Sequence, residues 1–279
     1  MKKFFRHIII FPILIISGCF QGDDPAPFNN FVVEGFIFEN EPVDNITIEG
    51  LAPIDSDEVN PDPVTDAVVS LSNGESSFPL NFNVETGKYE YNRNDLQVLG
   101  GREYVLEITS NGRTATSQTI VPQRPMNLEL TDSVLRIPPL SFGFSLAGEV
   151  ERLFNEERIT LTWDSEPNRF YFIIIESRLD ELAPILPEEV PQQSLELLAS
   201  FNTISEPSEA TSFEIIGIGL ESYGRYVATV FSVNDEYVDL FENSVQDSRD
   251  LNEPPSNVNN GLGIFTAFAT DSIMFEVRR

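Results

Sequence analysis

The sequence predicts an all-β protein, built from two tandem β-sandwiches with a short helix near the carboxyl end and long inserted loops. Short runs rich in β-branched and aromatic residues alternate apolar with polar positions, which is the pattern of half-buried strands. Turn dipeptides separate these runs at the short intervals typical of antiparallel sheets. The chain has 279 residues, 41% of them hydrophobic, and this is more than one compact sandwich uses.

The first predicted domain covers residues 31–122 and opens with the strand FVVEGFIF. Its clearest hairpin joins REYVLEITS to RTATSQTIV through Asn111-Gly112, a pair suited to the positive φ angles of a two-residue turn. The runs Ala67-Val68-Val69-Ser70-Leu71, Gly87-Lys88-Tyr89 and Tyr104-Val105-Leu106, with Gly101, resemble the prealbumin-like, immunoglobulin-like sandwich of carboxypeptidase regulatory domains. This resemblance implies a structural or adhesive module, with tyrosine hydroxyls bonded back to the backbone at strand corners.

The stretch after the first domain is punctuated by Pro122, Pro125, Pro138 and Pro139. Within it we interpret residues 123–135 as an interdomain passage that contains a connecting strand. The second predicted domain, residues 136–279, opens its core with RITLTWDSEPNRFYFIIIESR. The strand containing Trp163, the turn after it and the position of Tyr226 resemble a fibronectin type III domain. We expect Trp163 to pack in the core, and an exposed platform for stacking sugars is the alternative.

The carboxyl-terminal part contains one helical pattern and one glycine-rich run. Tyr237, Leu240, Phe241 and Val245 recur at helical spacing, which predicts a short amphipathic helix. The run Asn260-Gly261-Leu262-Gly263 lacks the lysine and the glycine spacing of a phosphate loop, so we expect its glycines to serve backbone geometry. The connection at residues 179–211 is too long for a sandwich turn, and connections of that length are functional or mobile.

The amino terminus, residues 1–18, predicts an export signal. Lys2, Lys3 and Arg6 precede an apolar run at residues 8–16. As a helix this run would span only about 13 Å, whereas a bilayer core is about 30 Å thick. The segment is therefore too short to be a transmembrane anchor and reads as a signal peptide.

The four residues Ile16-Ser17-Gly18-Cys19 resemble the lipobox of bacterial lipoproteins. The resemblance implies that Cys19 is acylated, for example with palmitate, and anchors the chain in a membrane. A soluble protein with Cys19 simply buried is the alternative. Residues 19–30 form an acidic tether, in which Asp23 and Asp24 resemble the export signal of Bacteroidota lipoproteins. This signal implies an outer-membrane location facing the cell exterior.

Charge and residue types exclude several function classes. The formal net charge of −28 repels polyanions, so nucleic acid is not an expected partner. The one histidine, His7, lies in the predicted signal peptide, so the mature chain has no imidazole for triad catalysis or zinc binding. We therefore predict a protein that is not an enzyme. A glycoside hydrolase that uses two carboxylates stays open as a third hypothesis.

Two acidic clusters are candidates for calcium, because hard oxygen ligands suit this ion. They include Asp55, Asp57 and Asp62 in the first half, and Asp235 and Asp239 in the second. Neither cluster has the spacing of a twelve-residue calcium loop, so we expect solvated loops and no cofactor, with calcium as the alternative.

Two serines are candidates for O-glycosylation. Asp132-Ser133-Val134 and Asp271-Ser272-Ile273 match the short pattern of an acidic residue, serine and an aliphatic residue that Bacteroidota glycosylate. The pattern makes Ser133 and Ser272 the predicted sites of attachment.

Several features together resemble an uncharacterised family of Bacteroidota outer-membrane lipoproteins, a domain of unknown function often encoded beside TonB-dependent receptors. They are the lipobox, the FVVEG strand, the LTWD strand and the closing SNVNNGLGIF. The resemblance implies a surface-exposed, non-enzymatic accessory or binding component of a TonB-dependent uptake system. The alternative is an independent glycan- or peptide-binding module, which would place exposed aromatic side chains beside residues 179–211.

Overall fold

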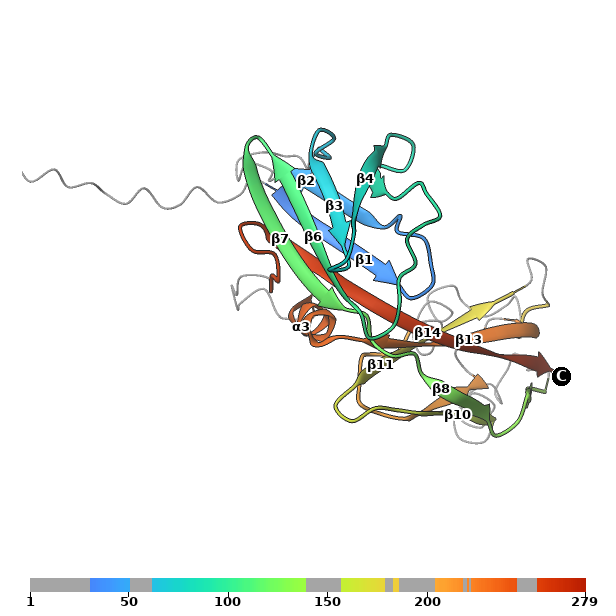
Figure 1. Ribbon diagram of the computed structural model, residues 1–279. Helices are drawn as coiled ribbons and strands as arrows, with labels where there is room; N and C mark the ends of the chain where they lie inside the picture. The colour runs from blue at the N-terminus through green and yellow to red at the C-terminus, as the bar shows by residue number, and fades with distance from the viewer. Residues whose placement is uncertain are drawn as a thin grey trace, which may run out of the picture.

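The computed structural model describes residues 31–50, 62–138, 157–178, 183–185, 204–217, 220, 222–244 and 255–279. These residues form a mostly β structure with one short helix, which confirms the predicted fold class (Figure 1). The predicted signal peptide, the tether with Cys19, two calcium candidates (Asp55 and Asp57) and most of the connection at 179–211 lie outside the described residues. No helix within the described ranges is long and apolar enough to cross a membrane.

The first half of the chain forms seven strands that enclose one core. The sheet order is β1-β2-β5-β4-β3-β6-β7, with the strands at Phe31–Phe38 (β1), Ile46–Gly50 (β2), Val68–Ser72 (β3), Ser77–Asn83 (β4), Lys88–Glu90 (β5), Glu103–Ser110 (β6) and Arg113–Ile120 (β7). Asn111 and Gly112 join β6 to β7 with φ angles of 52° and 75°, so the predicted hairpin is confirmed. Side chains at alternate positions of these strands build the core, as the period of a strand requires.

The second half forms a two-layer sandwich. Its elements are β8 (Met126–Leu130), β9 (Val134–Arg136), β10 (Arg158–Asp164), β11 (Phe170–Ser177), β12 (Ser212–Ile216), β13 (Gly224–Val233), α3 (Asp235–Ser244) and β14 (Leu262–Arg278). A small sheet of order β12-β10-β8 packs on the sheet that contains β11, β13, β14 and β9. The helix α3 confirms the predicted amphipathic helix over its described residues.

Trp163 lies in the core between these two layers. Its side chain is only 5% exposed, and its ring meets Tyr171 edge-on with 5.7 Å between the centroids. Core packing is therefore confirmed for Trp163, and the sugar-stacking alternative is wrong because the indole faces no solvent.

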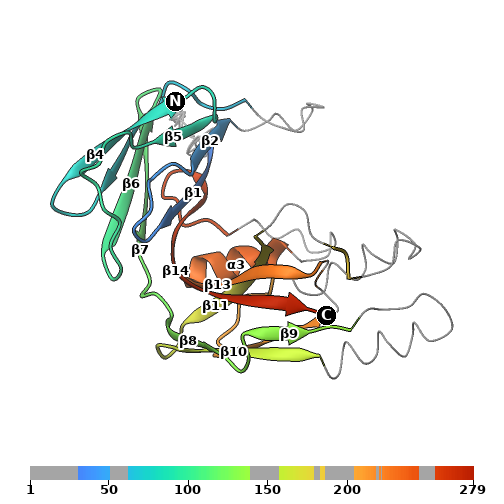
Figure 2. The same ribbon diagram turned by 90° about the vertical axis from the view of Figure 1, so that its right-hand side faces the viewer.

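The strand β14 belongs to both halves. Its 17 residues first pair in parallel with β1 through Leu262–Phe268, and then antiparallel with β13 from Ala269 to Val277. Both halves therefore share one continuous sheet, and Figures 1 and 2 show β14 running from the first group of strands into the second. The predicted boundary at 123–135 assigns all of β14 to the second domain, yet Phe265 and Ala267 pack in the first core.

The segment before β14 covers the open edge of β7. Thr116 and Asn259 exchange backbone hydrogen bonds of 3.1 and 2.7 Å. The side chain of Asn257 donates to the carbonyl of Phe265 at 2.7 Å and accepts from its N–H at 2.9 Å. This closing segment ties the last strand of the first sheet to β14, which leaves fewer unpaired edge groups to pair with other chains.

Gly263 allows the closing segment to enter β14. Its φ angle is 104°, and a Cβ atom there would lie 1.9 Å from the carbonyl oxygen of Val33 on β1. No side chain fits in that space. The expectation that Gly263 serves backbone geometry is confirmed, and the cause is the close approach of two paired strands.

Buried tyrosines fasten loops to both cores. The Tyr104 hydroxyl donates to the carbonyl of Gln97 and accepts from the N–H of Leu99, both at 3.0 Å. The Tyr226 hydroxyl donates to the carbonyl of Ser222 at 2.8 Å, as the tyrosine-corner interpretation expects. Burial raises the pKa of the Tyr104 hydroxyl. These two hydroxyl groups form hydrogen bonds with backbone groups, so they are not available to a ligand.

Replacing Gly263 tests the close approach of β14 to β1. We expect Gly263→Ala to lower the free energy of unfolding by at least about 3 kcal/mol, because its methyl group overlaps backbone. The control is Gly74→Ala, where φ is 83° but nothing lies within 4 Å of the added Cβ. There we expect a loss of about 1 kcal/mol. Urea unfolding measures both, and equal losses would contradict the account.

Candidate functional site

The outer face of the sheet β11-β13-β14 changes in character along its length. Alternate side chains of these strands point inward to the second core, and the others point outward. The backbone register places the outward residues in four rows: Phe172, Phe231 and Thr270; Ile174, Thr229 and Ser272; Glu176, Val227 and Met274; and Arg178, Arg225 and Glu276. The face is thus aromatic beside α3 and charged at the end remote from the first core.

The aromatic end is a cluster that joins the two halves. Seven aromatic residues form this junction cluster: Phe36, Phe38, Phe170, Phe172, Phe231, Tyr237 and Phe268. Phe268 lies on β14 where its pairing passes from β1 to β13, and its ring is 5.1 Å from Phe38 and 5.0 Å from Tyr237, between centroids. Burial raises the pKa of the Tyr237 hydroxyl. The cluster is therefore part of the structural junction, with several rings only partly buried.

Polar side chains complete the junction at the start of α3. Glu236 accepts hydrogen bonds from Thr119 at 2.8 Å and from Thr266 at 3.2 Å. Asn234 donates to the carbonyl of Ile120 at 2.8 Å, and Arg169 donates to the amide oxygen of Asn234 at 3.0 Å. Thr119 and Thr266 are buried, so these bonds satisfy groups that water does not reach. They join β7, β11, α3 and β14.

The structure does not bring the calcium candidates together within its described ranges. Asp235 and Asp239 are exposed on α3, and Asp62 lies beside β2, where its carbonyl accepts from Gly50. Over the described parts of the chain, no group of three His, Cys, Asp or Glu side chains is placed to hold a metal ion. Calcium binding that involves Asp55 and Asp57 stays a prediction.

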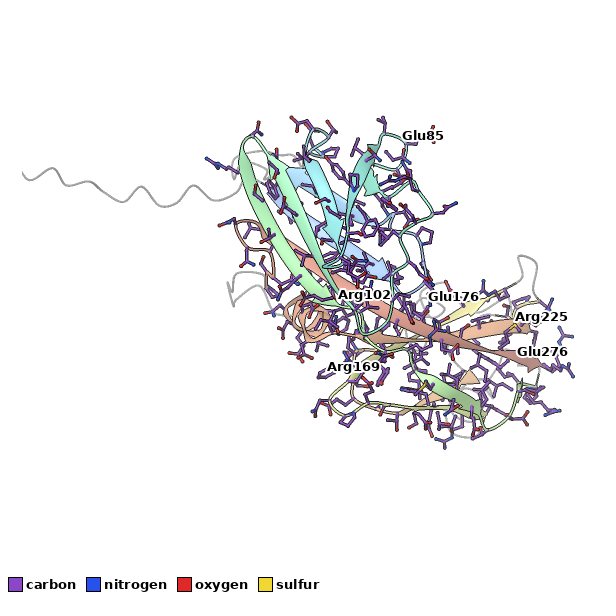
Figure 3. The ribbon with its side chains drawn as sticks, viewed as in Figure 1. Glu85, Arg102, Arg169, Glu176, Arg225 and Glu276 are labelled. Atoms are coloured by element: carbon purple, nitrogen blue, oxygen red, sulfur yellow. The ribbon has the colours of Figure 1, made fainter. Side chains whose placement is uncertain are left out.

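A hollow of about 550 Å³ lies at the charged end of the outer face. It is lined by Arg178, Arg225, Val227, Ser272, Ile273 and Met274. Its size is within the range of small-molecule sites, which is about 300 to 1,000 Å³. Figure 3 shows Arg225 and Glu276 together at this end of the sheet. The strands that hold the lining residues are fully paired here, so the hollow has a regular β-sheet as its floor.

The two arginines of the hollow differ from most of the other arginines that the structure describes, although Arg113, Arg136 and Arg279 also lack an ion pair with a described residue. Arg102, Arg124 and Arg158 each pair with a glutamate. By contrast, neither Arg178 nor Arg225 forms an ion pair with any residue that the structure describes.

Glu276 completes the row of charged side chains, but another arginine holds it. Arg278 donates to Glu276 at 2.5 Å. That hydrogen bond lowers the pKa of Glu276, and the charge of Arg225 adds to the lowering. Two guanidinium groups therefore remain at the hollow without a dedicated partner among the described residues.

A protein-family model described as "Domain of unknown function (DUF4249)" matches residues 24–273. The chain belongs to this family. A search of curated proteins gave no match. The match of this DUF4249 chain covers the first core, most of the second core and every lining residue of the hollow except Met274.

Solved structures similar to this DUF4249 chain contain fibronectin type III domains or come from an adhesin. A two-domain fibronectin type III segment of chicken tenascin is 10% identical and covers 89% of this chain and 98% of its own, with a TM-score of 0.23. A bacterial ice-binding adhesin is 10% identical, and the match covers 91% of this chain and 66% of the adhesin chain, with a TM-score of 0.22. The FN1–FN3 domains of chicken CNTN1 are 10% identical, and the match covers 88% of this chain and 65% of the CNTN1 chain, with a TM-score of 0.19. Scores this low carry no argument.

The two predicted glycosylation sites of the DUF4249 chain are exposed. Ser133 precedes β9, where its carbonyl accepts from the N–H of Glu276 at 2.9 Å, and Ser272 lies on β14 at the hollow. Glycosylation of either serine stays a prediction. The pair of Arg178 and Arg225 was missed, because these residues are far apart in the sequence and carry no motif.

Replacing Phe268 tests whether the junction cluster couples the two cores of the DUF4249 chain. We expect Phe268→Ala to cost about 3 to 5 kcal/mol in the free energy of unfolding, as deletion of a buried ring does. Fluorescence of Trp163, the only tryptophan, reports the second core, whereas circular dichroism reports both. We expect the two urea transitions to coincide in the natural protein and to separate in Phe268→Ala.

The control for this experiment is Phe265→Ala, which removes a fully buried ring from the first core and leaves the junction cluster complete. It should lower the stability while the two transitions still coincide. Coincident transitions in Phe268→Ala would show that the cluster does not couple the cores.

Proposed function

We propose that this protein is a lipoprotein anchored in the outer membrane through Cys19, facing the cell exterior, and that it is a non-enzymatic binding component of a TonB-dependent uptake system. The observation that carries the proposal is the position of the hollow relative to the start of the chain. Val32 lies beside Leu262 at the beginning of β14, whereas Met274 and Glu276 lie near its end. At about 3.3 Å per strand residue, the hollow is about 40 Å from that start.

This geometry suits a protein held by its amino-terminal end. The acidic tether of residues 19–30 leads directly into β1, so the first core is the part nearest to the anchor. The hollow at the far end of β14 would then point away from the membrane. Acyl chains on Cys19 contribute about 0.8 kcal/mol per buried methylene, and several chains hold a protein stably without a transmembrane helix.

The residue types support binding rather than catalysis. After removal of residues 1–18 the chain contains no histidine, and an acylated Cys19 leaves no free thiol. Three of the buried tyrosines, Tyr89, Tyr104 and Tyr226, bond to backbone groups, and Trp163 is buried. The hollow itself offers arginine, serine and apolar side chains, which hold a ligand but supply no base of near-neutral pKa.

An independent glycan- or peptide-binding module is the second candidate. The observation that favours it is the set of partly buried rings, Phe36, Phe38, Phe170, Phe231 and Tyr237, on the face that continues to the hollow. Ile204, which lies within the connection at 179–211, pairs with Ile174 on the same strand as Phe170. This candidate needs no receptor, so recovery of a receptor distinguishes the two. A glycoside hydrolase remains the third hypothesis.

Replacing Cys19 tests the anchor. We expect Cys19→Ala to move the protein from the outer-membrane fraction to the soluble or inner-membrane fractions, because no acyl chain can be attached. The matched control is Ser17→Ala, which keeps a small residue before the cysteine and should fractionate as the natural protein does. Sucrose-gradient fractionation with immunoblotting measures both. A Cys19→Ala protein that stayed in the outer membrane would contradict the proposal.

Purification of the natural, acylated protein tests the partner. We expect affinity capture from detergent-solubilised outer membranes to recover a TonB-dependent receptor, identified by mass spectrometry. The control is a capture from cells that produce Cys19→Ala, which should recover far less receptor because the protein no longer resides beside it. Repeated recovery of the lipoprotein alone would argue against a stable complex.

A further inference from the structure

We propose that the hollow beside Arg178 and Arg225 binds the oxyanion of a small ligand, a carboxylate or a phosphate, whose apolar part packs on Val227 and Met274. The proposal names the ligand class of the binding function proposed above and rests on it. Four features of the molecule support it: the placement of the two arginines, the pairing of Glu276 with Arg278, the apolar side chains of Val227 and Met274, and the net charge of the chain.

The two arginines lie directly opposite each other on paired strands. The N–H of Arg178 donates to the carbonyl of Arg225 at 3.0 Å, which continues the ladder of β11 and β13 by one residue. Directly opposite residues have Cβ atoms about 5 Å apart, and like charges in that position destabilise a sheet. A chain with 45 acidic residues places two cations here side by side. An oxyanion between them would relieve the repulsion.

Neither Glu176 nor Glu276, the two carboxylates in the neighbouring outward rows, forms an ion pair with Arg178 or Arg225. Glu276 is opposite Arg225 on β14, but Arg278 donates to it. Glu276 can neutralise part of the charge of Arg225, and it is on the opposite side of β13 from Arg178. Arginine presents its donors as a planar fork that fits a carboxylate or phosphate with two parallel hydrogen bonds. Two adjacent forks therefore define the recognition chemistry of the hollow.

The next row of the sheet contains Glu176 on β11 and two apolar side chains, Val227 and Met274. Val227 is 4% exposed and lies at the floor, whereas Met274 is 66% exposed. The thioether side chain of methionine is flexible and polarisable, so it adapts to ligands of differing shape. Ser272 adds one hydroxyl group as a donor or acceptor. A ligand with an anionic group beside an aliphatic or aromatic group matches this arrangement.

The net charge of the chain limits the size of the ligand. At −28 the whole molecule repels a polyanion, which would have to lie along many acidic side chains. A small anion interacts mainly with the charges within about one Debye length, which is about 8 Å at physiological salt. The described charged side chains in the outward rows at the hollow are Arg178, Arg225, Glu176 and Glu276, so the local charge there differs from the strongly negative charge of the whole chain.

Methionine methyl groups provide the test. The chain contains three methionines, and Met1 leaves with the signal peptide, so Met126 and Met274 remain. Both side chains are exposed, at 58% and 66%, but only Met274 lines the hollow. The protein used is the acylated mature chain in non-ionic detergent micelles, labelled with [methyl-13C]methionine. The Met274 signal reports the hollow, and the Met126 signal is an internal control.

Three probes separate the sources of the anionic group. They are N-acetylphenylalanine, phenyl phosphate and the neutral N-acetylphenylalanine amide. We expect the carboxylate, the phosphate or both to shift the Met274 signal in a saturable way, with a dissociation constant on the order of 1 mM, which corresponds to about −4 kcal/mol. The Met126 signal should not move. The neutral amide should bind at least about tenfold more weakly, because it loses the charge-assisted bonds.

Variants that are expected to change the affinity for the anions in opposite directions exclude a merely structural effect. Arg178→Gln and Arg225→Gln should each weaken binding about tenfold, the effect of one charge-assisted hydrogen bond. Glu276→Gln should strengthen binding, because it removes a carboxylate that competes for Arg225. The matched control is Arg113→Gln, in the exposed hairpin of the first core, which should bind as the natural protein does.

Several results would overturn this inference. They are an unmoved Met274 signal with both anions, equal shifts with the neutral amide, and unchanged affinity in Arg178→Gln and Arg225→Gln. If the hollow binds no anion while a receptor is still recovered, the inference fails and the proposed function stands. If the hollow binds the anions but neither anchor nor receptor is found, the inference stands and the proposed uptake function fails.

Discussion

The pairing of β14 with two different strands is the constraint on which the rest of the structure depends. Its first part pairs in parallel with β1, and its second part pairs antiparallel with β13. One strand therefore contributes Phe265 to the first core and Phe275 to the second. Because successive side chains of a strand alternate between its two faces, this pairing fixes which residues of both halves face inward. The close approach at Gly263 and the side-chain bonds of Asn257 set the register.

The same strand connects the fold to the proposed function. Phe268 is in the junction cluster, Ser272 and Met274 line the hollow, and Glu276 lies in the charged row. Polar contacts from Thr119 and Arg169 to the start of α3 add a second link between the halves. The strand β1, which follows the proposed anchor in the sequence, is thus joined to the hollow through a continuous ladder of backbone hydrogen bonds. The described part of the molecule is therefore one extended β platform built on a shared sheet.

Much of the local structure could be predicted from sequence, because it depends on local patterns. The hairpin at Asn111-Gly112, the buried Trp163, the corner at Tyr226 and the helix after Asn234 all carry signals within a few residues. The shared strand could not be predicted. The parallel pairing of β1 and β14 joins opposite ends of the chain, and such pairing leaves no local motif. The hollow is missed for the same reason, since its arginines become neighbours only through the register of β11 and β13.

Hydrogen–deuterium exchange along β14 tests the central claim most directly. If β14 is a shared strand of one cooperative platform, the slowest amides in Leu262–Phe268 and in Ala269–Val277 should exchange with the same free energy of opening, equal to that of global unfolding. The exchange should accelerate equally in both parts as urea is added, because both open in the same event. Different free energies for the two parts, with one exchanging through partial opening of its own core, would contradict the claim.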